Sequence, residues 1–260
     1  MKRKVSIAVI PDIGGGPWRY ERCIPWFPQN IGFRVISLPG YGGQPLNPEF
    51  KTVEDFAAAI KERIVNLPGP RFLFGTGIGG SLVLQVIQDP DIQVDGVILH
   101  APSGSHVQPL FFANAMKNVV TRKLLFKLMG TSVFRAHLRR KLFRQPIPDA
   151  FADQFFEEFR NCEAYHQMAN IITPEWFSTL KPVTIPSVIL WGGNEVKPSQ
   201  ERIDFCKSIL PDAEVRYIKE WDYFPMIEQP RSFARELSTI AQEMVSTGKD
   251  KIKGSGDKVT

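Results

Sequence analysis

Residues 72–81 read FLFGTGIGGS, and the rest of the chain is interpreted around them. The apolar residues at the start predict a buried strand, the small residues predict a tight turn, and the apolar run that follows predicts a helix. A strand, a sharp turn and a helix in this order are typical of a nucleophile elbow, which lifts a reactive side chain above a sheet. The small flanking residues Gly75 and Gly79 are present, but the central position is Gly77, which has no side chain.

Short β-rich segments alternate with helical periodicity on both sides of this turn. Expected strands are Val5–Ile10, Phe33–Leu38, Phe72–Phe74, Val97–His100, Ser187–Trp191 and Val215–Ile218. Expected helices begin at Thr52, where Asp55 completes a capping pattern, and cover Ile78–Gln88, Ser199–Leu210 and Pro230–Val245. The alternation predicts an α/β fold with a mostly parallel, twisted sheet and helices on both of its faces.

One long segment interrupts the alternation. Residues 104–182 show helical periodicity and no convincing strand pattern. An all-helical insertion between two strands is expected to form a cap over the carboxyl edge of the sheet, where ligands bind in open α/β folds. We therefore expect a core of residues 1–103 and 183–247, a helical cap of residues 104–182, and a polar, disordered tail of residues 248–260.

Composition excludes several classes of function. A chain of 260 residues with 43% hydrophobic content is long enough for one α/β domain, and no apolar run approaches the roughly 18 residues of a membrane span. Three scattered cysteines favour the cytoplasm, and a net charge of +5 is too small to indicate nucleic-acid binding. No metal-ligand spacing occurs, and the GxGxxG pattern beginning at Gly75 lacks the acidic residue of a dinucleotide site, so no cofactor is expected.

Beyond these patterns, the chain resembles the α/β-hydrolase family, in particular its capped, carboxylesterase-like members. Residues 38–42 (LPGYG) look like the turn after the family's fourth strand. Residues 190–198 (LWGGNEVKP) look like the segment that presents the acid of the catalytic triad, and residues 224–230 (FPMIEQP) like the segment after the triad histidine. The resemblance runs from Val5 to about Val245 and implies that the family's leading antiparallel strands are missing.

Carried over residue by residue, the resemblance implies a degenerate catalytic triad. Gly77 stands at the nucleophile, Tyr223 at the histidine and Glu195 at the acid. The oxyanion turn, which usually reads His-Gly, reads Pro11-Asp12. The residues expected to line or border the ligand pocket are Asp12, Ile13, Gly77, Ile78, Ser103 and Asp222.

These replacements decide what chemistry is expected. Acyl transfer needs a nucleophile with a base beside it, and a tyrosine phenol with a pKa of about 10 is a poor base near neutral pH. We therefore expect a protein that has lost serine-hydrolase chemistry and binds a small hydrophobic or acyl-type molecule in a capped pocket. The alternative is a lyase, isomerase, cyclase or water-nucleophile hydrolase that uses Glu195 as base and Tyr223 as donor.

Two histidines remain as further candidates. His100 ends a strand and His106 follows it, so either side chain could reach the pocket mouth. The competing interpretation is a buried, hydrogen-bonded His100 and a surface His106. Substituting Gly77→Ser and Tyr223→His together is expected to create esterase activity if the remaining parts of the site are intact.

The first half of the expected cap is strongly basic. No acidic residue occurs between Gly104 and Pro148, and the cations there include Arg135, Arg139, Arg140, Lys141 and Arg144. This pattern fits a solvated outer face, a docking surface for an acidic carrier protein or phosphorylated ligand, or attachment to an anionic membrane surface. Acidic residues return at Asp149, Asp153, Glu157 and Glu158.

Overall fold

A computed structural model describes residues 5–103, 118–193 and 200–256. Its centre is a six-stranded sheet with the order β2-β1-β3-β4-β5-β6, and every pairing between described strands is parallel. The strands are β1 (Val5–Ile10), β2 (Ile31–Val35), β3 (Arg71–Thr76), β4 (Gly96–His100), β5 (Ser187–Gly192) and β6 (Glu214–Ile218). The predicted α/β class and parallel sheet are confirmed.

Helices cover both faces of this sheet, as the alternation of side chains along β1 requires. Ile7 and Val9 belong to the hydrophobic cluster on one face, and Ala8 and Ile10 belong to the cluster on the other. The first face carries α1 (Trp18–Glu21), the 3-10 turn η1 (Ile24–Trp26), α11 (Pro225–Glu228) and α12 (Pro230–Gly256). The second face carries α2 (Val53–Ile64), α3 (Ile78–Val86) and α10 (Gln200–Ile209).

The ends of two helices compare directly with the sequence patterns. The capping box at α2 is confirmed, because Thr52 and Asp55 each accept a hydrogen bond from the other's backbone N–H. At the other end of the chain, a disordered tail was expected from residue 248, whereas α12 continues to Gly256. No proline interrupts this lysine-rich segment, so the helix can continue past Val245 although Gly248 disfavours it. No helix in the described part of the chain is long and apolar enough to cross a membrane.

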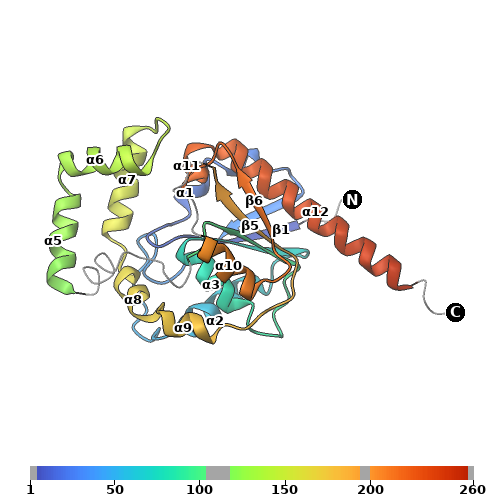
Figure 1. Cartoon of the computed structure of the whole chain (residues 1–260). Helices are drawn as coiled ribbons and strands as arrows, with labels where there is room; N and C mark the ends of the chain where they lie inside the picture. Colours follow the sequence, from blue (N-terminus) through green and yellow to red (C-terminus); the bar gives the residue numbers. More distant parts are fainter. Residues whose placement is uncertain (1–4, 104–117, 194–199, 257–260) are drawn as a thin grey trace.

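The segment between β4 and β5 is helical wherever it is described. It contains α5 (Val119–Met129), α6 (Ser132–Leu142), α7 (Asp149–Arg160), α8 (Ala164–Ile171) and α9 (Pro174–Thr179). Figure 1 shows α5, α6 and α7 set to one side of the sheet, while α8 and α9 lead back towards α2 and α3. Buried Met168 of α8 and Phe177 of α9 join the same hydrophobic cluster as α2 and α3. The insertion is therefore anchored on the core at its carboxyl-terminal end.

Candidate functional site

The turn between β3 and α3 has the backbone of a strained elbow. Gly77 has φ 53° and ψ −121°, and a positive φ of this kind is costly for residues with a Cβ atom. Its N–H donates to the carbonyl of His100 (3.3 Å), and its carbonyl accepts from the N–H of Ser103 (3.2 Å). A Cβ on Gly79 would lie 2.2 Å from the carbonyl oxygen of Ile10, so this glycine lets α3 approach β1. The turn is thus fixed at the carboxyl edge of the sheet.

The space above Gly77 is already filled by two other side chains. An ideal Cβ built on this glycine would lie 2.3 Å from Asp12 Oδ1 and 2.5 Å from Tyr223 Oη. Both separations are far shorter than a normal van der Waals contact. A carboxyl and a phenol therefore occupy the volume into which a side chain at the elbow would project.

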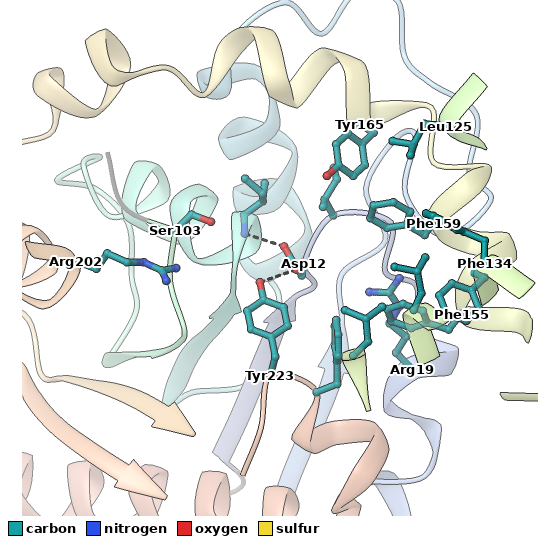
Figure 2. A pocket seen from close by; sticks show the side chains of 16 residues that line it. Asp12, Arg19, Ser103, Leu125, Phe134, Phe155, Phe159, Tyr165, Arg202 and Tyr223 are labelled. Atoms are coloured by element: carbon teal, nitrogen blue, oxygen red, sulfur yellow. Dashed lines mark hydrogen bonds between the residues drawn. The ribbon is translucent and has the colours of Figure 1, made fainter. Parts of the chain in front are cut away.

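The Asp12 carboxyl also takes the hydrogen-bond donors around the elbow. The Ile78 N–H donates to Oδ1 (2.9 Å), the Tyr223 hydroxyl donates to Oδ2 (2.9 Å), and the Ile13 N–H is a further donor to this carboxyl. Figure 2 shows Asp12 between its two dashed hydrogen bonds. In a nucleophile elbow, the N–H after the central residue forms half of the oxyanion hole. Here that N–H belongs to Ile78 and is occupied by a carboxyl of the chain itself.

Burial sets the protonation behaviour of Asp12. Desolvation raises its pKa above the ordinary value, while the Ile78, Ile13 and Tyr223 hydrogen bonds and the charge of Arg19 act in the opposite direction. Asp12 is partly accessible and lines a cavity. A carboxyl with a raised pKa in such a place is able to accept or hold a proton beside a bound molecule.

The cavity in front of Asp12 has a volume of about 510 Å³. Its apolar wall consists of Ile13, Ile78, Leu125, Phe134, Leu138, Leu142, Phe155, Phe156, Phe159 and Phe224. Its polar groups belong to Asp12, Arg19, Ser103, Tyr165, Arg202 and Tyr223. In Figure 2, the labelled cap side chains Leu125, Phe134, Phe155 and Phe159 lie on one side of Asp12, and Ser103 and Arg202 lie on the other.

One buried ion pair joins the core to the cap beside this cavity. Arg19 Nε of α1 lies 3.5 Å from Glu158 Oε2 of α7, and the two side chains are 3% and 13% exposed. The guanidinium of Arg19 also stacks on the ring of Phe155, 4.4 Å from its centroid. Desolvation raises the pKa of Glu158 to about 7, although the charge of Arg19 opposes this shift.

The structure brings together most of the residues that the sequence placed at the pocket. Asp12, Ile13, Ile78, Ser103 and Tyr223 line the cavity, and Gly77 lies beneath Asp12. Of the others, Asp222 does not line the cavity, and Glu195 lies outside the described residues.

Asp222 is not among the residues that line the cavity. Its carboxyl binds Arg144 Nε of the cap (2.7 Å) and accepts the Tyr223 N–H (2.9 Å). It therefore ties the cap to the segment that carries Tyr223. Glu195 and His106 lie outside the described residues.

His100 is fully buried and is not among the residues that line the cavity. Its Nδ1 lies 3.1 Å from the Thr76 hydroxyl, and its ring packs edge-on against Trp221. Of the two interpretations that the sequence left open for His100, this arrangement fits the buried, hydrogen-bonded histidine. Sequence reasoning missed Arg19, Tyr165 and Arg202 as cavity residues, because nothing in their local patterns indicates which way they face.

Three of the five basic cap residues singled out from the sequence pair with acidic ones. Arg135 pairs with Asp153 (3.1 Å) and Glu157, Arg139 pairs with Asp149, and Arg144 pairs with Asp222. Arg140 and Lys141 are exposed. The segregation of charge seen along the sequence is therefore partly compensated in space, because α6 packs against the acidic helix α7. In the described part of the chain, no group of three or more His, Cys, Asp or Glu side chains is placed to hold a metal ion.

Comparisons with known proteins agree with this architecture. The family model described as "Alpha/beta hydrolase family" matches residues 10–236. No curated protein matches the chain. Among solved structures, Cfl2 from Burkholderia cenocepacia aligns with a TM-score of 0.72 at 15% identity, over 91% of this chain and 88% of that one. MenH from S. aureus aligns with a TM-score of 0.70 at 16% identity, over 94% and 96% of the two chains.

A lipase-esterase related protein from Clostridium acetobutylicum is also similar. It aligns with a TM-score of 0.64 at 13% identity, over 92% of this chain and 95% of that one. At identities this low, the structural likeness bears on the fold alone.

Proposed function

The chain belongs to the alpha/beta hydrolase family, and from this premise we propose that it has lost serine-hydrolase chemistry and encloses a small hydrophobic or acyl-type molecule in its capped cavity. The observation that carries the proposal is the Asp12 carboxyl above Gly77. It fills the volume of the missing side chain and accepts the Ile78 N–H. The apolar cavity in front of it supplies the space for a ligand.

Three requirements of acyl transfer are unmet at this elbow. Gly77 supplies no attacking atom, and the resemblance to the family implies that Tyr223 stands where a general base is expected. The Ile78 N–H, which would stabilise a tetrahedral oxyanion, already donates to Asp12. An ester carbonyl that enters the site would meet the Asp12 carboxyl. At the elbow it would find neither a nucleophile nor a free donor.

The cavity has the properties of a small-molecule site. Its volume of about 510 Å³ lies within the roughly 300–1,000 Å³ typical of ligand pockets. Its wall is mainly aromatic and aliphatic, and a few polar groups converge at the sheet edge. Such a lining favours a molecule with a substantial apolar part.

The proposal is tested by native mass spectrometry of the full chain with a cavity-filling variant. We expect a co-purifying small molecule in the wild type and its loss in Leu138→Trp, because Leu138 lines the cavity. Val133→Trp is the matched control, since Val133 lies on the same helix and is 81% exposed. Turnover of short aryl esters by the wild type, together with covalent labelling by a fluorophosphonate, would overturn the proposal.

A second candidate is an enzyme of the same fold that works by proton transfer. The hydrogen bond between Tyr223 and Asp12 favours it, because it places a carboxyl of raised pKa beside a phenol at the cavity wall. Asp12 would then act as the base, the role that the sequence suggested for Glu195. With the co-purified molecule as the starting point, Asp12→Asn should retain binding and abolish turnover. Equal turnover by Asp12→Asn and wild type would exclude this candidate.

Docking of the cap on an acidic carrier protein or an anionic membrane surface is the weakest candidate. The ion pairs of Arg135, Arg139 and Arg144 reduce the net charge of this surface. Such a surface would use exposed cations such as Lys123, Lys127, Arg140 and Lys141. Salt-sensitive binding to anionic vesicles or carrier protein, lost in Arg139→Glu with Arg140→Glu, would support it. Unchanged binding by this double variant would count against it.

A further inference from the structure

We infer that Arg202, together with the hydroxyl of Ser103, binds the carboxylate of an acidic ligand in the cavity. This inference rests on the proposed function and names the chemical class of the molecule enclosed. Both residues line the cavity, Arg202 from the first turn of α10 and Ser103 from the segment after β4. Figure 2 shows them on the same side of the Asp12–Tyr223 pair.

The two arginines that line the cavity differ in how their charge is matched. Arg19 lies 3.5 Å from a carboxylate oxygen of Glu158. In the described part of the chain, no carboxylate lies within ion-pair distance of Arg202. Its guanidinium donates to the carbonyl of Pro102 (3.2 Å) and stacks over Trp191 at 5.1 Å.

The Arg202 guanidinium also has unused hydrogen-bonding capacity. Its Nε is buried and has no hydrogen-bond partner among the described residues. A guanidinium carries five N–H donors in a planar fork that matches a carboxylate. A cation beside an apolar wall is costly unless an anion or acceptor compensates it. A carboxylate on the ligand would supply both the charge and the missing acceptor.

Ser103 supplies a second donor on the same side of Asp12 as this guanidinium. Its backbone N–H is used by the Gly77 carbonyl (3.2 Å), which fixes the residue at the sheet edge. Its side chain is 5% exposed and borders the cavity. The carbonyl that Arg202 binds belongs to Pro102, the residue immediately before Ser103, so the hydroxyl and the guanidinium are held by one short segment.

An anionic head group is expected beside Arg202, because the donor at the elbow is already occupied. The Ile78 N–H is occupied by Asp12, and a carboxylate ligand beside Asp12 would be repelled by it. A head group on Arg202 avoids this repulsion. The hydrocarbon part of the ligand then extends to the aromatic side chains of the cap, which lie across Asp12 in Figure 2.

Three probes with the same ten-carbon chain separate the head group from the hydrocarbon: decanoate, decan-1-ol and decylamine. Their binding to the full chain, stripped of any co-purified molecule, is measured by isothermal titration calorimetry. We expect decanoate to bind at least 10-fold more tightly than the alcohol or the amine. Arg202→Gln should weaken decanoate binding by about 10- to 100-fold, the range for a hydrogen bond to a charged group, and change decan-1-ol binding by less than about 2-fold.

Controls keep this result interpretable if one variant folds poorly. Arg202→Lys retains the charge and should recover part of the decanoate affinity. Arg231→Gln removes an arginine that also stacks on a tryptophan, Trp26, but lies outside the cavity, and it should leave all three affinities unchanged.

Equal binding of decanoate and decan-1-ol, or unchanged decanoate binding in Arg202→Gln, would overturn the inference while leaving the proposed function intact. Binding of none of the probes would contradict the proposed function, and this inference with it.

Discussion

The two sides of the cavity are built from different chemistry. The core side carries Asp12 and Tyr223, which are hydrogen-bonded to each other at the edge of a fully parallel sheet. The cap side contributes mainly hydrocarbon, and its outer surface leaves large apolar side chains in solvent, such as Val120 (74% exposed) and Val133 (81% exposed). The difference indicates that the core places the polar groups of the site, whereas the cap determines how much apolar volume a ligand can occupy.

Contacts from α7 and from the segment after α6 join the cap to the core, among them the Arg144–Asp222 ion pair. Phe155 packs on Phe224 with ring centroids 4.9 Å apart. Glu228 accepts the N–H groups of Arg144 and Gln145, both at 2.8 Å. Together with the Arg19–Glu158 pair, these contacts close the cavity and are the natural points at which to separate the two sides.

The largest effect is expected on the core side, at Gly77. Gly77→Ser should lower the free energy of unfolding by about 2–6 kcal/mol, since the positive φ and the clash with Asp12 each cost roughly 1–3 kcal/mol. Gly43→Ser is the matched control, because Gly43 also has a positive φ (77°) but has nothing within 4 Å of its built Cβ. It should cost only about 1 kcal/mol. Equal losses in urea unfolding would show that the space above Gly77 is empty.

On the cap side, the next largest effect is expected at Phe155. Phe155→Ala should destabilise the protein by about 3 kcal/mol, because the buried ring contacts Phe143, Phe156 and Phe224. Val133→Ala, on the neighbouring helix α6, should change stability by less than about 0.5 kcal/mol. Chemical denaturation of both variants measures the difference. A similarly small effect of both would mean that the cap does not pack on the core.

The boundary between the two sides should respond to pH through Glu158. Because its folded pKa is raised to about 7 from 4.5, the folded state binds more protons than the unfolded state between these values. The contribution of this group to stability is therefore present at pH 4.5 and is lost as the pH rises through about 7. The loss is at most about 3 kcal/mol, at 1.36 kcal/mol per pKa unit.

Substitution of Glu158 isolates that contribution. Between pH 5 and 8 the urea midpoint should decline in the wild type, and Glu158→Gln should remove the part of this decline that Glu158 causes. Glu157→Gln, which alters the preceding residue of α7 and its surface pairs with Arg135 and Arg160, should keep it. The same pH slope in Glu158→Gln and wild type would contradict the assignment.

The smallest expected effect is a gain of activity on the core side. The sequence suggested that Gly77→Ser with Tyr223→His would create an esterase, but the structure puts the Asp12 carboxyl in the way of the new hydroxyl. We expect this double variant to be inactive and the triple variant that also carries Asp12→Gly to hydrolyse a short aryl ester slowly. Measurable hydrolysis by the double variant alone would show that Asp12 does not block the site.

Local patterns predicted the fold well, because the alternation of strands and helices and the capping box of α2 depend on neighbouring residues. They also placed Asp12 and Tyr223 at the pocket, through resemblance to a family. They did not show that Asp12 reaches over Gly77, because its partners Ile78 and Tyr223 lie 66 and 211 residues away in sequence. The contacts that decide the site are therefore tertiary.

The charge pairing of the cap also depends on tertiary contacts that local patterns do not predict. From the sequence, the basic segment looked unopposed because the acidic residues follow it in a separate run. In the structure, Arg135 and Arg139 of α6 meet Asp153 and Asp149 of α7. Charge patterning along a chain does not predict which helices will pack together, and so it did not show these two pairings.

A double-mutant cycle between Gly77→Ala and Asp12→Gly tests most directly whether the Asp12 carboxyl occupies the space above the elbow. If it does, Gly77→Ala should cost about 2 kcal/mol less in the Asp12→Gly background than in the wild type, a coupling within the range for residues in contact. A coupling below about 0.5 kcal/mol would mean that the two positions do not meet. The proposal of a blocked, ligand-enclosing site would then have lost its foundation.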